Sequence, residues 1–140
     1  MADRPVVLVV DDNAPTRILI REFLLDRDVD SVEARDGEQA IALLEERDFD
    51  LVLLDILMPN RDGFEVLRWA AQQECRVPFV AMSQERAGST QMSYAAMATS
   101  MGAVRGIDKP ITAAKIADVL EVVGIATDYA PVIARCAPRR

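Results

Sequence analysis

The sequence predicts an α/β fold in which a doubly wound sheet of five parallel strands lies between two layers of helices. First, short runs rich in Val, Ile and Leu recur along the chain, as expected of strands buried on both faces. Second, apolar residues between these runs recur at the spacing of amphipathic helices. Alternating strands and helices form a three-layer sandwich. The 140 residues, 51% hydrophobic and 28% charged, suit a single globular domain with a full core.

Five short runs are predicted to be strands. The first is wholly apolar, and the second has a weaker pattern followed by the turn signal Asp36-Gly37. The third is expected to be central, because it is almost uninterrupted Leu and Val. The predicted strands are residues 6–10, 30–34, 50–54, 79–82 and 103–107.

Five helices are predicted between and after these strands, at about residues 15–26, 38–47, 63–73, 90–100 and 112–123. Asn13 and Thr112 are predicted N-caps of the first and last, and Pro15 is tolerated in a first turn. The side chains expected to face the sheet are Ile18, Leu19, Phe23, Leu24, Ala40, Ile41, Leu44, Phe64, Leu67, Ala71, Met92, Ala96, Met97, Ile116, Val119, Leu120 and Val123.

Charge and composition exclude several classes of function. With 23 acidic and 16 basic residues the net charge is −7, which argues against a nucleic-acid-binding surface. No apolar run is long enough to span a membrane, and no signal-peptide pattern occurs, so a cytoplasmic location is expected. The absence of histidine excludes histidine-based acid–base chemistry. Cys75 and Cys136 lack metal-ligand or redox-motif spacing and are expected to be ordinary thiols.

Polar side chains follow four of the predicted strands. Asp11 and Asp12 follow the first, Asp55 the third, Ser83 the fourth and Lys109 the fifth. Ligands of such sheets bind at the carboxyl ends of the strands, so these side chains are expected to converge. Clustered carboxylates repel one another, and Mg²⁺ prefers oxygen ligands. The ammonium and hydroxyl suit phosphate oxygens, and the carboxylate at the central strand suits a nucleophile that forms an aspartyl phosphate.

These residues belong to a longer ordered set of motifs: Asp11-Asp12, Leu53-Leu54-Asp55-Ile56-Leu57-Met58-Pro59, Asp62-Gly63, Ser83 and Lys109-Pro110. In this order and on these elements the set resembles the receiver domains of two-component response regulators, over about residues 5–123. The resemblance implies a flavodoxin-like (βα)5 fold with strand order 2-1-3-4-5.

The resemblance also implies a phosphoryl switch. Asp55 would accept a phosphoryl group from a histidine kinase or a histidine phosphotransfer protein, and Ser83 and Lys109 would bind its oxygens. The Lys109–Pro110 peptide bond would be cis. A partner-binding face within residues 84–123 would then change its affinity for a downstream effector protein. Such a domain catalyses only its own phosphorylation and dephosphorylation, so it is not expected to be an enzyme acting on other substrates.

The implied cofactor is Mg²⁺. Asp12 and Asp55, with the backbone carbonyl of Leu57, would bind the ion directly. Asp11 would act through a metal-bound water. Gly63 would sit where the loop after Asp55 turns into the third helix.

Three positions depart from the family pattern. The aromatic residue usual three positions before the lysine is replaced by Gly106, which has no side chain to rotate. Gln84 stands where a small residue is usual, and the segment from Ser83 to Lys109 is longer than typical. We therefore hypothesise that phosphorylation orders or shifts residues 84–101 without an aromatic rotamer change.

The expected organisation is a receiver domain at 1–123 and a C-terminal tail at 124–140 without an output domain. Two other functions differ in what they require of this site. A phosphatase of the haloacid dehalogenase type needs an Asp two residues after the nucleophile, where this chain has Leu57. A receiver-fold interaction module that does not respond to phosphorylation stays open because of Gly106.

Overall fold

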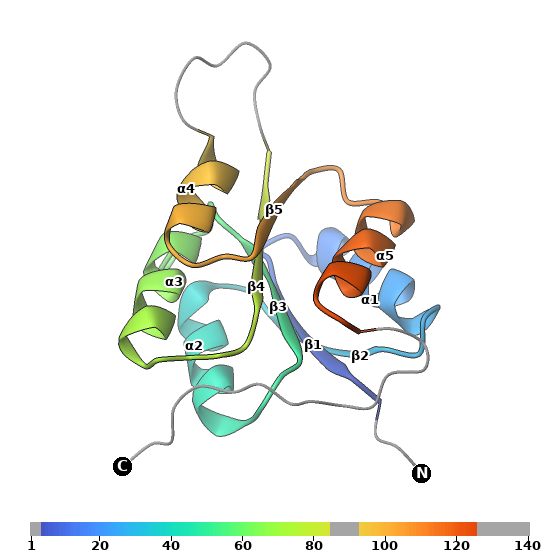
Figure 1. Cartoon of the computed structure of the whole chain (residues 1–140), viewed down its shortest axis with the longest axis horizontal. Helices are drawn as coiled ribbons and strands as arrows, with labels where there is room; N and C mark the ends of the chain where they lie inside the picture. The colour runs from blue at the N-terminus through green and yellow to red at the C-terminus, as the bar shows by residue number, and fades with distance from the viewer. Residues whose placement is uncertain (1–3, 85–92, 126–140) are drawn as a thin grey trace.

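The computed structural model describes residues 4–84 and 93–125, which form five strands and five helices in alternation (Figure 1). The strands are β1 (Val6–Val10), β2 (Asp30–Ala34), β3 (Leu51–Asp55), β4 (Phe79–Ser83) and β5 (Arg105–Asp108). The helices are α1 (Ala14–Leu25), α2 (Gly37–Glu46), α3 (Gly63–Gln72), α4 (Tyr94–Ser100) and α5 (Ala113–Val122).

The strands form one parallel sheet in the order β2-β1-β3-β4-β5, which confirms the predicted fold class. The chain passes from β1 outward to β2 and then returns to β3 on the other side of β1. This reversal makes the β1–β3 boundary the switch point where open α/β sheets bind ligands. Val10 pairs with Leu54, so the residues that follow them, Asp11 and Asp55, end neighbouring strands at this boundary.

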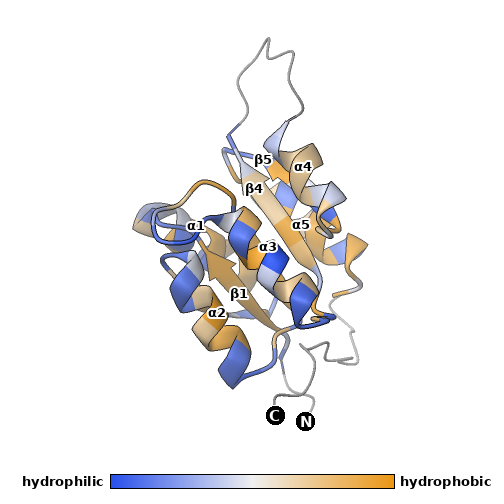
Figure 2. Ribbon diagram, turned by 90° about the vertical axis from the view of Figure 1, so that its left-hand side faces the viewer, coloured by the Kyte–Doolittle hydropathy of each residue, from blue (hydrophilic) through white to orange (hydrophobic). Residues whose placement is uncertain are grey.

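The two faces of the sheet support separate hydrophobic cores because alternate strand residues point to opposite faces. On one face, Leu8 and Val52 pack in a cluster with residues of α2, α3 and α4. On the other face, Val9 and Leu53 pack in a cluster with residues of α1 and α5. Figure 1 shows these two helical layers on opposite sides of the sheet, and Figure 2 shows hydrophobic strands between them. The strand ends are thus held by packing on both faces.

The predicted inner faces of three helices differ from the structure. In α1, Ile18 and Leu19 are 47% and 44% exposed, while Ile20 and Leu24 are the buried side chains. In α3, Ala71 is exposed and its neighbour Ala70 is buried. In α4, Ala96 and Met97 are exposed and only Ala98 is buried. Several apolar residues occur in succession in these helices, so spacing alone left the choice of face open.

Helix starts were predicted more accurately than helix faces. Asn13 caps α1 by accepting a hydrogen bond from the Thr16 backbone N–H, and Thr112 caps α5 in the same way. Helix α4 begins at Tyr94, after the N-cap Ser93, so it starts later than predicted. Residues 85–92, including the predicted core residue Met92, and residues 126–140 of the predicted tail lie outside the described residues. None of the described helices has the length and apolar character of a membrane span.

Cys75, in the turn after α3, is disulfide-bonded, so the expectation of an ordinary thiol is wrong for this residue. The other cysteine of the sequence, Cys136, lies outside the described residues.

Candidate phosphoryl and metal site

Three predicted carboxylates meet at the carboxyl end of β1 and β3. Asp55 is the last residue of β3, and Asp11 and Asp12 directly follow β1. One carboxylate oxygen from each lies within 4.8 Å of the others. Asp11 and Asp55 are buried, and Asp12 is exposed. Because the donors are all carboxylate oxygens that would repel one another without a cation, the arrangement fits a hard divalent ion such as Mg²⁺.

Lys109 enters this cluster from the end of β5. Its Nζ lies 2.8 Å from Asp11 Oδ2 and 3.4 Å from Asp55 Oδ1. Burial lowers the pKa of Lys109, but its hydrogen bond to Asp11 and the charges of Asp55 and Asp11 outweigh this, so the net effect raises the pKa. The ammonium therefore remains charged between the two carboxylates.

Burial is the main influence on Asp55. It raises the pKa of this carboxyl group from 3.8 to about 7, with a further increase from the charge of Asp11. The charge of Lys109 and its hydrogen bond oppose this rise without cancelling it. In the ion-free protein at neutral pH, a large fraction of Asp55 therefore holds a proton, and added positive charge would favour its ionised form.

An open hollow of about 310 Å³ lies above these groups. It has room for several waters or a small anion, since liquid water occupies about 30 Å³ per molecule. The residues that line it are Asp12, Asn13, Asp55, Leu57, Ser83, Gln84 and Lys109. The predicted hydroxyl of Ser83 is thus at the same hollow as the predicted nucleophile. Leu57 is at its rim with a side chain that is 55% exposed.

Close backbone contacts fix the loop that leaves Asp55. The Gly63 N–H donates to the Ile56 carbonyl at 2.8 Å, and a Cβ on Gly63 would lie 2.6 Å from the Asp55 carbonyl oxygen. Gly37 donates to the Arg61 carbonyl at 3.1 Å, and a Cβ there would lie 2.2 Å from that oxygen. Both glycines thus allow neighbouring backbone to approach closely. The prediction that Gly63 marks the turn into α3 is confirmed.

The loop that carries Lys109 is held on both sides. The Lys109 N–H donates to the Ser83 carbonyl at 2.9 Å, and the Lys109–Pro110 bond is cis, as predicted. Lys115 Nζ donates to the carbonyls of Asp108 and Pro110, at 2.8 and 3.0 Å. These contacts place Lys109 beside the carboxylates of two other strands.

The departure at Gly106 has a structural counterpart. A Cβ on Gly106 would lie 2.4 Å from the Cβ and 3.1 Å from the Cα of Ala95. Helix α4 therefore rests directly on β5 at this point, and its first turn occupies the space that a side chain of residue 106 would need. Gln84 is exposed and lines the hollow, which agrees with its predicted position near the site.

Two supporting residues were not identified from the sequence. Arg17 Nη1 donates to the Asp11 carbonyl at 2.6 Å, and Lys115 makes the contacts described above. Arg17 is four residues after the cap Asn13, which is about one helical turn. Helical spacing could therefore have indicated that its side chain lies near the end of β1. Lys115 is three residues after the cap Thr112 and could have been found in the same way.

Comparison with known proteins identifies one family over most of the chain. Residues 7–121 match the family described as the response regulator receiver domain. The solved receiver domain of NtrX from Brucella abortus has a TM-score of 0.75 and 30% identity, over 84% of this chain and 96% of that one. The signal receiver domain of a putative Luxo repressor protein from Vibrio parahaemolyticus has a TM-score of 0.77 and 26% identity, over 86% and 90%.

Longer curated proteins share parts of this sequence. The autoinducer 1 sensor kinase/phosphatase LuxN of Vibrio campbellii is 35% identical over 58% of this chain and 10% of its own length. The transcriptional regulatory protein ResD of Bacillus subtilis is 47% identical over 44% of this chain and 26% of its own length. The aligned segments are thus small parts of the relatives that contain them.

Proposed function

Because the chain belongs to the response regulator receiver domain family, we propose that Asp55 accepts a phosphoryl group from a phosphohistidine. The donor would be a histidine kinase or a histidine phosphotransfer protein, and the phosphorylated form would bind a downstream effector protein differently. The observation that carries the proposal is the buried Asp55 carboxylate, at an open hollow and paired with Lys109 3.4 Å away.

Mg²⁺ is the proposed cofactor. Asp12, Asp55 and the backbone carbonyl of Leu57 would bind it, with Asp11 acting through a bound water. When bound, the ion supplies positive charge that favours ionised Asp55 and neutralises phosphoryl oxygens. The cluster of three carboxylates within 4.8 Å supports this assignment.

The chain's own groups divide the transfer between them. An unprotonated Asp55 oxygen attacks phosphorus, and a new O–P bond forms as the P–N bond to the donor imidazole breaks. The electron pair of the broken bond stays on the imidazole nitrogen. The Lys109 ammonium and the Ser83 hydroxyl donate hydrogen bonds to the phosphoryl oxygens. These hydrogen bonds stabilise the negative charge on the oxygens in the transition state. Hydrolysis by water later returns Asp55 to its free form.

The proposed output is a change on the partner-binding face within residues 84–123. Gly106 carries no aromatic side chain to turn inward, and Ala95 of α4 rests on it instead. A movement of Ser83 toward the phosphoryl group would therefore act on residues 84–101 through α4. Hydrogen exchange of the α4 and β5 amides, with and without a phosphoryl mimic, tests this route. Unchanged exchange would contradict it.

A second candidate function has the same fold but no response to phosphorylation. It is a protein-interaction module, and the close contact between Ala95 and Gly106 favours it, because α4 is already seated against β5. The two functions differ in whether phosphorylation changes the affinity for a partner protein. A switch requires the partner to bind the phosphorylated and unphosphorylated states with different affinities.

The proposed phosphoryl transfer from a histidine kinase or phosphotransfer protein would place this domain in the cytoplasm. The disulfide at Cys75 runs against that location, because stable disulfides are rare in the cytosol. Purification under alkylating conditions would show whether Cys75 is oxidised or a free thiol. A free thiol would support the cytoplasmic location, and a disulfide would contradict it.

Intact mass spectrometry tests the chemistry directly. Wild type and Asp55→Asn would be incubated with acetyl phosphate, with Mg²⁺ or with EDTA. We expect a single phosphoryl adduct on the wild type with Mg²⁺ and none under the other conditions. Wild type that takes up no phosphoryl group would favour the interaction module, and an adduct on the variant would place the acceptor elsewhere.

A further inference from the structure

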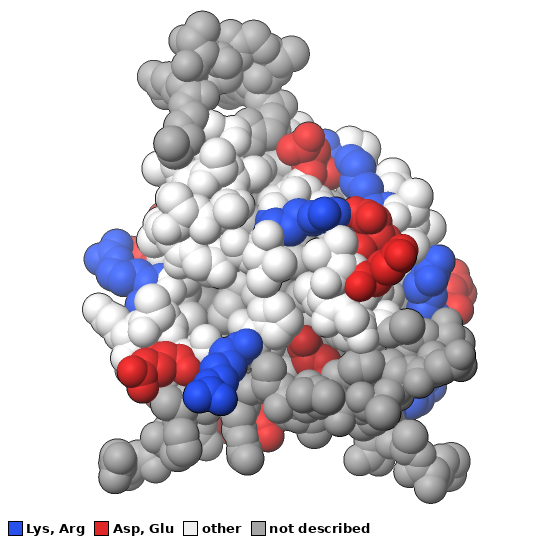
Figure 3. All heavy atoms as spheres, in the orientation of Figure 1, with Lys and Arg blue, Asp and Glu red and all other residues white. Residues whose placement is uncertain are grey.

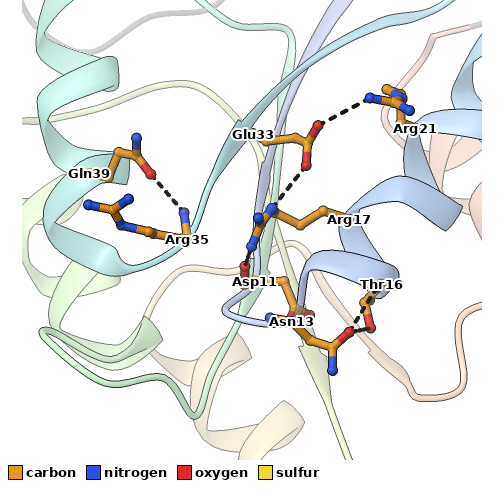
Figure 4. Close-up of polar contacts among 8 residues, drawn as sticks. All are labelled: Asp11, Asn13, Thr16, Arg17, Arg21, Glu33, Arg35 and Gln39. Carbon is orange, nitrogen blue, oxygen red and sulfur yellow. Dashed lines mark hydrogen bonds and ion pairs between the residues drawn. The ribbon is translucent and has the colours of Figure 1, made fainter.

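Arg17 links the acidic end of β1 to the rest of the fold without reaching any carboxylate of the site. Its Nη1 donates to the backbone carbonyl of Asp11 at 2.6 Å, and its Nε donates to Glu33 Oε1 of β2 at 2.9 Å. Figure 4 shows this guanidinium between the Asp11 carbonyl and Glu33. The side chains of Arg17 and Glu33 are 17% and 30% exposed, so the contacts are partly shielded from water.

The Asp11 carbonyl belongs to the peptide unit that leads into the next carboxylate, Asp12. A peptide unit is planar, so the carbonyl of Asp11 and the N–H of Asp12 belong to one rigid group. Holding that carbonyl fixes the orientation of the peptide and limits the directions open to the Asp12 side chain. The Asn13 N–H, one residue further, donates to Asp11 Oδ1 at 2.9 Å, so the Asp11 carboxylate is restrained from the same turn.

Glu33 holds Arg17 in this position. Its Oε1 accepts from Arg17, and its Oε2 lies 3.6 Å from Arg21 Nη1, one helical turn further along α1. Glu33 pairs in register with Val9 of β1, which places it close to the end of that strand. Two cations of α1 and one carboxylate of β2 thus form a network that, among the described residues, contacts the site at the Asp11 carbonyl.

We infer that Arg17 is a positioning residue that orients the Asp11–Asp12 peptide for binding of a divalent cation and phosphoryl transfer. The inference rests on the proposed function of Asp55. The three carboxylates repel one another when ionised, and a flexible turn would let Asp12, the exposed member, swing into solvent. A guanidinium fixed at two points opposes that movement, in the way that outer contacts orient metal ligands.

The test compares Mg²⁺ binding in wild type, Arg17→Met and Arg17→Lys by isothermal titration calorimetry. Outer contacts of metal ligands typically contribute 10- to 100-fold in affinity, so we expect the Mg²⁺ dissociation constant to rise about tenfold in Arg17→Met. Lysine keeps the charge but lacks the fork that reaches two acceptors, so we expect Arg17→Lys to weaken binding as well.

Arg21→Met is the matched control. It removes a cation from the same helix and the same Glu33 partner, but Arg21 makes no recorded bond to the Asp11 carbonyl within the described residues. We expect it to reduce the unfolding free energy less than Arg17→Met does, because Arg21 is 43% exposed, and to leave Mg²⁺ affinity close to that of wild type. Faster hydrogen exchange of the Asn13 amide in Arg17→Met, measured in EDTA, gives a second readout that needs no metal.

The outcomes separate the two proposals. If wild type binds Mg²⁺ and both Arg17→Met and Arg17→Lys bind it with the affinity of wild type, the positioning role alone is overturned. Equal weakening by the Arg17 and Arg21 variants also overturns it, because the effect would then come from the stability of α1. Wild type that binds no Mg²⁺ overturns the metal site and, with it, the positioning role.

Discussion

At the carboxyl end of β1 and β3, three carboxylates and an ammonium gather beside an open hollow. Nearby, α4 rests on β5 through Ala95 and Gly106, two of the smallest residues in the protein. The first region is charged and partly buried, and burial sets the pKa of its central group. The second is uncharged along α4, and Figure 3 shows a surface without Lys, Arg, Asp or Glu there.

The charged region is the proposed place of phosphorylation, and the contact between α4 and β5 is the proposed route by which phosphorylation affects a partner. The charged region depends on pH and ions, because its carboxylates repel one another until a cation or proton is present. The contact between α4 and β5 depends on shape, because a single added methyl group has no space there. Perturbations of charge should therefore act mainly on the first region, and perturbations of volume on the second.

The largest effect is expected from Asp55→Asn in ion-free protein. Burial raises the pKa of Asp55 in the folded state from 3.8 to about 7, so ionisation disfavours folding and wild type loses stability as the pH rises through this range. At pH about 8 the variant should be more stable by about 2–4 kcal/mol, since each pKa unit corresponds to about 1.4 kcal/mol. Urea unfolding in EDTA measures the difference.

The advantage of Asp55→Asn should shrink as the pH falls from about 7 to 3.8 and approach zero well below 3.8, where the carboxyl group is protonated in both the folded and the unfolded state. Asp12→Asn is the control, because this carboxylate is exposed and its neutralisation should stabilise less. An Asp55→Asn advantage that is the same at low and high pH would contradict burial of the charge as the cause.

The next largest effect is expected from Lys109→Met. Its ammonium lies between two carboxylates and is proposed to bind a phosphoryl oxygen, so the rate of phosphoryl uptake should fall about 100-fold. Timed intact mass spectra give the rate. Lys115→Met serves as the control, since this second lysine binds only the carbonyls of Asp108 and Pro110 in its recorded hydrogen bonds. Equal losses in the two variants would mean that loop geometry, rather than the charge of Lys109, governs the rate.

A smaller effect, confined to the uncharged region, is expected from Gly106→Ala. The added Cβ would lie 2.4 Å from that of Ala95, so overpacking should reduce the unfolding free energy by about 1–3 kcal/mol. Urea unfolding checks this value, and phosphoryl uptake should persist because no group of the charged region is changed.

The double variant Ala95→Gly/Gly106→Ala sharpens this test. It removes the colliding methyl group, so it should be more stable than the sum of the two single changes predicts. Ala95→Gly alone is expected to cost about 1 kcal/mol as a helical glycine. Additive effects would show that the two residues are not in contact.

The smallest effect is expected from Arg105→Met, which removes the ion pair between β5 and Asp118 of α5. The two side chains are 40% and 59% exposed, so solvent screens their attraction and the loss should not exceed about 0.5 kcal/mol. Thermal unfolding at low and high salt would measure it. A large loss would mean that charge, as well as close packing, holds β5 in the second region.

Local patterns predicted much of the site because its chemistry lies at strand ends. Each functional residue follows an apolar run, and parallel strands end at one edge, so Asp11, Asp55 and Lys109 had to meet there. The spacing of Arg17 from Asn13 points it toward the end of β1, but its second partner, Glu33, lies sixteen residues away on β2 and is not indicated by that spacing. A single side chain does not indicate which distant acceptor it will reach.

The sequence by itself determined the class of the fold, the order of its elements and the helix starts at Asn13 and Thr112, because hydrophobic periodicity and capping act over a few residues. Tertiary structure decided which face of α1 is buried, how closely α4 approaches Gly106 and how strongly burial raises the pKa of Asp55. These properties arise from atoms brought together across the chain, whose distances and solvent exposure exist only after the layers have packed.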